Sequence, residues 1–315
     1  MVSGQRLRHL AVQPQTAARY RSAYLVFKRF VSVFFNMSVS EAASRLLLDE
    51  CFEFFVDKCY QHFGGSRRQL CVNALQGVLL EHGHQLRNSF PCSRRALTAW
   101  TRTVPTRSAL PLPQHWVDVF AAVAVLRGYG VLGLGLVVCF DGYLRVSELC
   151  NLHGSDILVE SRSTSGSTGC GLRIRKAKTG KNQFARITDP LVIDVLRLLK
   201  SITPADQLVF KGATPRFFNK LLTLLCHTLD IKHRFTMHSL RHGRASKAHL
   251  DREPPEHIRL DGRWASSTSM EGYLQAAVSL LQTLTCSDDL QSLFRMGPAC
   301  RAALVPLYHR TPRRY

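Results

Sequence analysis

The strongest constraint on the fold is a break in the helical pattern after the first hundred residues. Residues 101–114 carry prolines at positions 105, 111 and 113 among Thr, Ser and Arg. Such a stretch ends a helix and is typical of a linker. A chain of 315 residues is also long enough for two domains. We therefore predict one domain over residues 1–100, a linker over 101–114, a second domain over 115–300 and a basic tail over 301–315.

The first hundred residues have a helical pattern with a basic character. Between Thr16 and Phe30, aromatic residues recur at helical spacing among arginines and a lysine, which predicts a helix with one packed face and one basic face. Ser40 and Glu41 open a second predicted helix, and residues 51–63 form a third. The pattern predicts at least these three helices, and their basic face either meets phosphate groups or is merely solvated.

The residues after the linker predict helices and a short sheet. Residues 157–187 read as strands, interrupted by a Ser/Gly-rich loop at 161–171 and closed by a Thr-Gly-Lys-Asn hairpin turn. Thr236 is the expected N-cap of a later helix. The fold class is therefore mainly α with a small β-sheet (α+β). The other helices are expected at residues 116–129, 131–140, 191–199 and 215–229.

Composition favours an anionic partner inside the cell. With 42 Lys and Arg against 22 Asp and Glu, the net charge is +20, and such a field attracts phosphate backbones. A membrane surface is also anionic, but the longest apolar stretch, residues 131–140, is too short to span a bilayer. We expect no membrane association and no secretory signal. The ten scattered cysteines form no C-x-x-C pair and indicate reduced, mostly buried thiols without a zinc site.

Three short segments carry the functional signal. They read Leu144-Arg145-Val146-Ser147-Glu148-Leu149, then H-S-L-R-H-G-R-A-S from His238, then Gly262-Arg263-Trp264 with Tyr273 nine positions after the tryptophan. Their order resembles the tyrosine recombinase (phage integrase) family, and a basic hairpin lies between the first two segments, as the family has it. Each segment alone is weak, because an Arg–Glu pair is usually a helix-surface pair and a lone tryptophan is usually core. The resemblance would be accidental only if all of these simpler explanations were true at the same time.

These residue types suit the cleavage of a phosphodiester. Two guanidiniums, Arg145 and Arg241, can grip one phosphate in forked, charge-assisted pairs. A phenol is mostly protonated at neutral pH, so an attacking Tyr273 needs a nearby proton acceptor or a positive field. His238 lies three residues before Arg241, on the same helical face. The resemblance makes the arginines the phosphate clamp, Tyr273 the nucleophile and His238 the group that assists proton transfer.

Two further residues complete the expected site. Trp264 stands at the family's His/Trp position, where an indole N–H can donate to a phosphate oxygen but cannot carry a proton. The resemblance makes Lys178, in the hairpin, the group that protonates the leaving oxygen. Lys176 and Lys181 remain rivals because hairpin register is uncertain by a residue. Tyr143 is a rival nucleophile, whereas Tyr308 and Tyr315 look incidental in the basic tail.

The resemblance implies an all-helical core-binding domain followed by a tyrosine recombinase catalytic domain. Its activity would be site-specific cleavage and rejoining of DNA through a covalent 3′-phosphotyrosyl intermediate, without metal, ATP or another cofactor. The partners would be double-stranded DNA and further copies of the chain in a tetrameric synapse, with no small-molecule substrate. Two alternatives stay open: a domesticated DNA-binding protein that no longer cuts, and an enzyme like type IB topoisomerases that relaxes DNA.

The tail beyond Tyr273 and the departures from the family pattern bear on assembly and source. Apolar helical patterns at 276–284 and 291–296 predict packing either into a neighbouring protomer or onto the chain's own core. The family usually has glycine where Tyr143 stands, and Leu-Gly where this chain has Gly262-Arg263. Together with Trp264, this looks more like recombinases of eukaryotic mobile elements, such as DIRS-type retrotransposons or cryptons. The expected location is nuclear for such an element and cytoplasmic otherwise.

Overall fold

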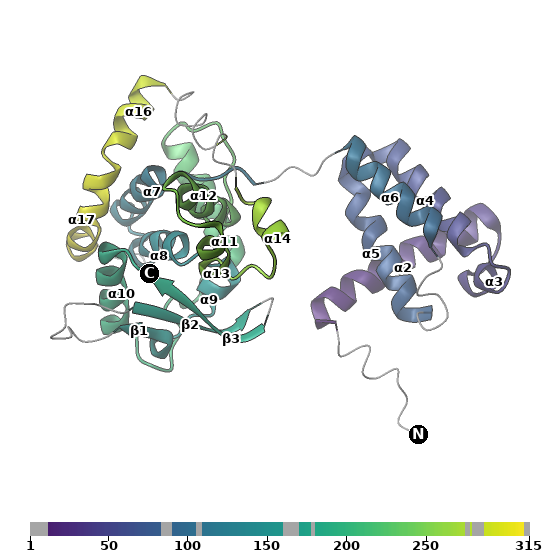
Figure 1. Ribbon diagram of the computed structural model, residues 1–315, viewed down its shortest axis with the longest axis horizontal. Coiled ribbons are helices and arrows are strands. Elements are labelled where there is room, and N and C mark those ends of the chain that lie inside the picture. Colours follow the sequence, from purple (N-terminus) through teal and green to yellow (C-terminus); the bar gives the residue numbers. More distant parts are fainter. Residues whose placement is uncertain are drawn as a thin grey trace. The chain divides into compact units, whose positions relative to one another are not determined.

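The computed structural model divides the chain into two compact units, Met1–Arg107 and Ser108–Tyr315. It describes residues 12–82, 90–104, 109–159, 170–177, 180–274, 278 and 287–311. In those residues the first unit is helical throughout, and the second combines helices with a three-stranded sheet (Figure 1). The predicted fold class, mainly α with a small sheet, is confirmed. Within the described residues, no helix has both the length and the apolar character needed to cross a membrane.

The first unit is a small helical bundle. Its long first helix begins at a proline, which suits the first helical position, and ends at Asn36 in the left-handed conformation, φ 51°. The three helices that the sequence predicted here are all present. The elements are α2 Pro14–Phe35, α3 Val39–Ser44, α4 Leu48–Phe63, the 3-10 turn η1 Gly64–Arg67, α5 Arg68–His82 and α6 Pro91–Thr103.

Aromatic side chains fill the core of this bundle. Phe27 packs against Phe52 and Phe55 with ring centroids 4.7 and 5.4 Å apart, and Phe52 meets Phe90 at 6.0 Å. The start of α6 is held by a side chain of another helix, because the carboxylate of Asp49 accepts hydrogen bonds from the backbone N–H groups of Cys92 and Ser93, both at 2.9 Å. The packing thus joins α2, α4 and α6.

The predicted linker was too long at both ends. Helix α6 continues to Thr103, where the hydroxyls of Thr101 and Thr103 donate back to carbonyls of the preceding turn. At the other end Leu112 is fully buried in the second unit, and its N–H donates to the carbonyl of Ser239 at 2.9 Å. Prolines 111 and 113 therefore stop helix formation without freeing the chain from the core. Residues 105–108 lie outside the described residues.

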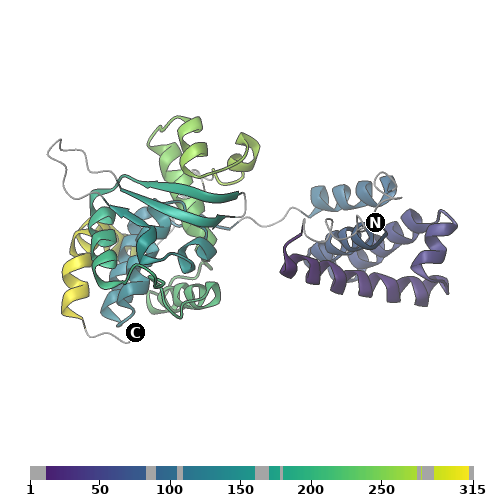
Figure 2. The same cartoon turned by 90° about the horizontal axis from the view of Figure 1, so that it is seen from below.

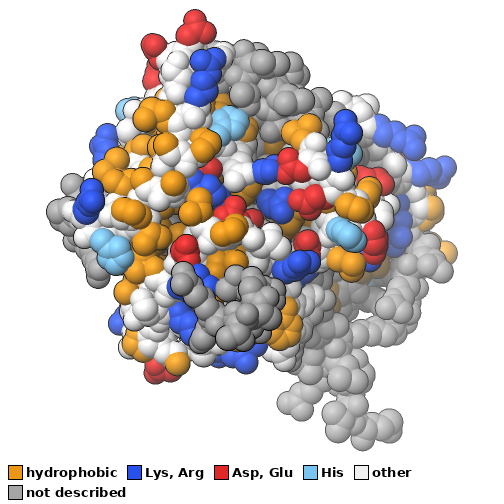
Figure 3. All heavy atoms as spheres, turned by 60° about the vertical axis from the view of Figure 1, so that its left-hand side comes forward, with side chains coloured by type: hydrophobic (Ala, Val, Ile, Leu, Met, Phe, Trp, Pro, Cys, Tyr) orange, Lys and Arg blue, Asp and Glu red, His pale blue; other side chains and the backbone are white. Residues whose placement is uncertain are grey.

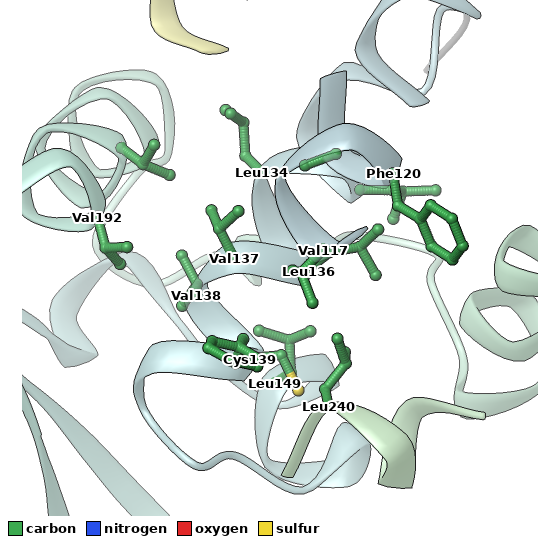
Figure 4. Packing of buried hydrophobic residues seen from close by; sticks show 14 of the residues in the cluster. Val117, Phe120, Leu134, Leu136, Val137, Val138, Cys139, Leu149, Val192 and Leu240 are labelled. Atoms are coloured by element: carbon green, nitrogen blue, oxygen red, sulfur yellow. The ribbon is translucent and has the colours of Figure 1, made fainter. Parts of the chain in front are cut away.

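The second unit is built around one wholly buried helix. In α8 every residue from Leu132 to Asp141 is buried, as a helix apolar on all sides requires. Figure 4 shows its side chains pointing toward α7, α9, α10 and α12. The helices are α7 Gln114–Leu126, α8 Gly130–Asp141, α9 Val146–Cys150, η2 Gly154–Asp156, α10 Pro190–Ile202, α11 Pro215–Thr228, α12 Met237–Leu250, α13 Pro255–Asp261, α14 Ser267–Glu271, α16 Asp288–Arg295 and α17 Gly297–Arg310.

The sheet lies at the edge of this helical core (Figure 2). Its strands β1 Ile157–Val159, β2 Cys170–Ala177 and β3 Gly180–Ile187 are antiparallel, in the order β1-β2-β3. The hairpin is confirmed, but Ala177 already pairs with Gly180, so the turn comes earlier than the predicted Thr-Gly-Lys-Asn. Likewise, strand pairing already begins at Cys170, which the sequence placed in the loop. The loop residues 160–169 lie outside the described residues.

The C-terminal segment corrects the prediction of a basic tail. Residues 297–310 form α17, in which Leu304 and Tyr308 are buried in the core. In α16, the ring of Phe294 stacks on Trp116 of α7 with centroids 4.1 Å apart. On the side of α17, acidic and basic side chains intermingle with apolar ones (Figure 3). The second predicted tail segment, 291–296, therefore packs on its own chain, whereas 276–284 lies outside the described residues except for position 278.

Candidate active site

A tight turn between α8 and α9 places Arg145. Tyr143 in this turn has φ 49°, in the left-handed region where glycine is normally favoured, and its side chain is 2% exposed. Burial raises the pKa of the Tyr143 phenol. Its hydroxyl has no hydrogen-bond partner among the described residues. Tyr143 thus belongs to the packing beneath the site, and this geometry speaks against its alternative role as nucleophile.

Arg145 is the N-cap residue of α9, and its partner is buried. The guanidinium of Arg145 lies 2.7 Å from one carboxylate oxygen of Glu148, whose side chain is only 1% exposed. The other carboxylate oxygen accepts the backbone N–H of Arg145 at 2.9 Å. Arg145 and Glu148 are therefore not an ordinary helix-surface pair. The buried carboxylate of Glu148 binds both the main chain and the side chain of Arg145.

Helix α12 carries His238 and Arg241 from its first turns. Thr236 is its N-cap residue, as predicted. His238 is exposed, whereas Arg241 is fully buried and donates to the carbonyls of Tyr143 and Gly262. Burial, followed by the positive charges of Arg145 and Arg263, lowers the pKa of Arg241 to about 10, so the guanidinium stays charged at neutral pH.

Tyr273 lies directly over this helix. Its ring centroid is 5.2 Å from that of His238 and 4.9 Å from that of Trp264. The guanidinium carbon of Arg241 is 5.6 Å from the centre of the same ring. Four of the six predicted site residues thus meet at one place. Arg145 is linked to them through Glu148, which also pairs with Arg263. Arg263 and Arg241 both donate to the carbonyl of Tyr143.

His242 is a neighbour of Tyr273 that the sequence analysis did not single out. Its ring stacks on that of Tyr273, with centroids 4.4 Å apart and planes 22° apart. Burial, followed by the charges of His238 and Arg241, lowers the pKa of His242 to about 4. The signal was available, since His242 is one turn after His238 and so shares its helical face.

Trp264 is buried over the backbone of its own segment. A Cβ on Gly262 would lie 1.6 Å from the indole ring, so only glycine fits at that position. The guanidinium of Arg241 lies 4.4 Å from the Trp264 ring centre, in a cation–π contact. The indole N–H is buried and has no hydrogen-bond partner among the described residues. This leaves a donor that is available once a ligand reaches it.

The predicted lysine, Lys178, is the candidate site residue whose position the structure does not describe. Lys178 lies outside the described residues, and the side chains of Lys176 and Lys181 are outside them as well. The backbones of Lys176 and Lys181 face each other across the hairpin. Among the other candidate tyrosines, Tyr308 is buried in the core and Tyr315 is outside the described residues. The described residues contain no group of three or more His, Cys, Asp or Glu that could hold a metal ion.

No protein-family model and no curated protein matches the chain. Solved structures do resemble it. The Tn1549 transposon integrase in complex with circular intermediate DNA has TM-score 0.51 at 13% identity, over 82% of this chain and 98% of that one. Lambda integrase bound as a dimer to a COC′ core site has TM-score 0.50 at 14% identity, over 86% and 93%. The XerH site-specific recombinase bound to palindromic difH substrate, in a post-cleavage complex, has TM-score 0.50 at 15% identity, over 75% and 78%.

Proposed function

We propose that this chain, which has the fold of the tyrosine recombinases, is a site-specific DNA recombinase that cuts and rejoins strands through Tyr273. The observation that carries the proposal is the meeting of Tyr273 with His238, Arg241 and Trp264, which come from segments far apart in the sequence. A phenol, an imidazole and a charged guanidinium at one place are the groups that phosphoryl transfer to a tyrosine needs.

In the proposed reaction, Arg145 and Arg241 stabilise the phosphate as negative charge builds on its non-bridging oxygens. Tyr273 attacks the phosphorus, its proton passes to His238 or to water, and the DNA 5′ oxygen leaves as the 3′-phosphotyrosyl bond forms. Lys178 is the proposed donor of the proton to that oxygen, with Lys176 and Lys181 as rivals. The covalent bond preserves the energy of the phosphodiester, so rejoining requires neither ATP nor a cofactor.

The buried state of Arg241 bears on how DNA enters the site. Arg241 lies beneath the rings of Trp264 and Tyr273, so a phosphate reaches it only after a ring has moved. We expect Tyr273 to move, because Trp264 is only 6% exposed and is fixed against Gly262. The two carbonyl contacts leave N–H groups of the Arg241 guanidinium free to bind the phosphate.

The proposal extends to the first unit and to assembly. We assign the helical unit as the core-binding domain, supported by the arginines exposed on α6 and by the net charge of +20. Exchange of strands between two sites requires copies of the enzyme on each, so we also propose a tetrameric synapse on DNA. In the single chain, α16 and α17 pack on their own core, so we propose the earlier predicted segment, 276–284, as the one exchanged between protomers.

The test uses a suicide DNA substrate with a nick near the cleavage point, in the presence of EDTA. Wild-type protein should remain attached to the 3′ end on a denaturing gel. Tyr273→Phe removes only the attacking oxygen, so it should bind DNA as well as wild type and form no covalent product. Tyr143→Phe is the matched control and should retain cleavage. Persistent covalent product in Tyr273→Phe would move the nucleophile to another residue.

The same assay, together with relaxation of a supercoiled plasmid and recombination between two sites, separates the alternatives. A DNA-binding protein that no longer cuts would give no covalent product with any substrate. An enzyme of the topoisomerase IB kind would relax supercoiled DNA of arbitrary sequence and would not join two sites. A recombinase should exchange strands only between the inverted repeats that flank its natural element.

A further inference from the structure

Arg263 has a backbone conformation that its residue type rarely adopts. Its φ is 53°, in the left-handed region where glycine is favoured, and its side chain is 6% exposed. It stands directly before Trp264, at the position where the family pattern has glycine. A long charged side chain in a strained, buried position indicates that its contacts compensate for the strain.

The contacts of Arg263 all reach the turn that carries Arg145. One terminal nitrogen donates to the carbonyl of Gly142 at 3.2 Å, and the other donates to the carbonyl of Tyr143 at 3.4 Å. The second nitrogen also lies 2.8 Å from a carboxylate oxygen of Glu148. That oxygen is the one that accepts the backbone N–H of Arg145. Glu148 is therefore shared between two arginines.

This sharing changes what Arg145 can do. With Arg145 as its sole partner, the buried Glu148 would neutralise that guanidinium, and little net charge would remain for a phosphate. Arg263 supplies a second positive charge to the same carboxylate. Burial alone would raise the pKa of Glu148, but Arg263 and the bonds from Arg145 hold it below its ordinary value, so the carboxylate stays ionised.

We propose that Arg263 is a positioning residue for Arg145. By holding Glu148 and the Gly142–Tyr143 backbone, it keeps the Arg145 guanidinium oriented toward the phosphate and leaves its positive charge available to that phosphate. The inference rests on the proposed function. It assigns Arg263 no contact with DNA, since its side chain is only 6% exposed and its terminal nitrogens bond Glu148 and the turn backbone. It also explains why the departure from glycine at this position leaves the site intact: the side chain adds an ion pair to the turn.

The test compares Arg263→Gly with Arg252→Gly. Arg252 also has a left-handed backbone, φ 60°, but its side chain is exposed, so it is a matched change of the same chemistry outside the site. Glycine relieves backbone strain at both positions, and thermal unfolding should show that both variants are folded. Arg263→Gly should bind a single DNA site within about threefold of wild type and form covalent product about 10- to 100-fold more slowly. Arg252→Gly should match wild type, and Arg263→Lys should recover part of the rate.

A second substrate separates positioning of a charge from simple packing. A methylphosphonate at the cleavage point removes one negative charge from the phosphate, so less charge must be stabilised. On it, the defect of Arg263→Gly relative to wild type should shrink to within about threefold. An equal defect on both substrates, or wild-type cleavage by Arg263→Gly, would overturn the inference while leaving the proposed function in place. Absence of covalent product in wild type would overturn both.

Discussion

The two units differ in what they bury. Among the described residues of the first unit, Ser93 is the single buried polar side chain, and Phe, Val, Leu and Cys make up most of the rest of the core. The second unit buries charges throughout: Asp118, Asp141, Glu148, Asp156, Arg241 and Arg301, with Ser239, His242 and Ser246. The first unit is stabilised by apolar packing, whereas the second unit contains buried charges whose removal from water is destabilising.

The difference shows where the chemistry is expected. Removing a charge from water is costly unless it is paired, and a hydrophobic pair would often be more stable. The second unit nevertheless pairs Arg301 with Asp118 at 2.5 Å and Arg263 with Glu148 at 2.8 Å. The pair Arg263–Glu148 lies beside Arg145 of the candidate site, where fixed charges are expected to be ready before a substrate arrives. The pair Arg301–Asp118 instead joins α17 to α7. The first unit needs no buried ion pairs to bind a phosphate backbone through exposed arginines.

The largest expected effect concerns exposed charge in DNA binding. With about 6–10 phosphate contacts, affinity should fall roughly 10³- to 10⁵-fold between about 50 and 200 mM salt. Replacing Arg94 and Arg102, both exposed on α6, with Gln should lower the salt slope by about 0.9 for each lost contact. The buried-charge variant Arg263→Gly should leave the slope unchanged. Fluorescence anisotropy at several salt concentrations measures the slope. A wild-type affinity that hardly changes with salt would contradict the binding model.

The next effect concerns the apolar core of the first unit. Phe52→Ala removes a fully buried ring and should lower the free energy of unfolding of that unit by about 3–5 kcal/mol. The control Val33→Ala, at a side chain 69% exposed on α2, should cost less than about 1 kcal/mol. Calorimetry should show two transitions, with only the one of the first unit shifted by Phe52→Ala. A common shift of both transitions would mean that the units do not unfold separately.

Acid should destabilise the second unit through His242. The pKa of this histidine is about 4 when folded, because of burial and the charges of His238 and Arg241, and near its ordinary value when unfolded. As pH falls below about 6.5, the unfolded chain gains a proton that the folded one does not. Stability should therefore drop by up to about 1.4 kcal/mol per pH unit down to about pH 4.

The contribution of His242 is measured by comparing the loss of stability in acid between wild type and His242→Gln. Burial raises the pKa of Asp118 to about 6, although Arg301 opposes the shift, and this carboxyl therefore gains its proton earlier in the folded state. Its contribution stabilises the fold as pH falls through the same window, opposite in sign to that of His242. Urea unfolding at pH 7 and pH 5 should show a smaller acid loss in His242→Gln than in wild type. Identical losses would mean that His242 has an ordinary pKa.

The smallest effect concerns a polar contact in the first unit. Asp49→Ala removes the acceptor of two N–H groups at the start of α6 and should cost about 1–2 kcal/mol, as loss of a helix cap does. Asp57→Ala, at an exposed carboxylate of the same helix α4, is the control and should be nearly neutral. If the two variants unfold alike, Asp49 does not stabilise α6.

Local pattern predicted much of the fold, and its failures have a common cause. Helix α11 follows from its apolar spacing, α8 from its continuous apolar run, and Thr236 from its capping chemistry. The basic tail was wrong because Arg301, which looks solvated in the sequence, is paired with Asp118, which is 183 positions earlier. The burial of Glu148 was not visible for the same reason, since its carboxylate pairs with Arg263, which is 115 positions later. Neither partner can be seen from neighbouring residues.

The sequence by itself determined a set of candidate groups for the site. It gave the order of Arg145, His238, Arg241, Trp264 and Tyr273, and the helix that carries His238 and Arg241. What only the tertiary structure decided is which of them are covered and which charges share a partner. Arg241 is buried beneath two rings, and Glu148 joins Arg145 to Arg263. Spacing along a helix fixes which side chains share a face, whereas burial and ion pairing depend on contacts that close only when distant segments pack together.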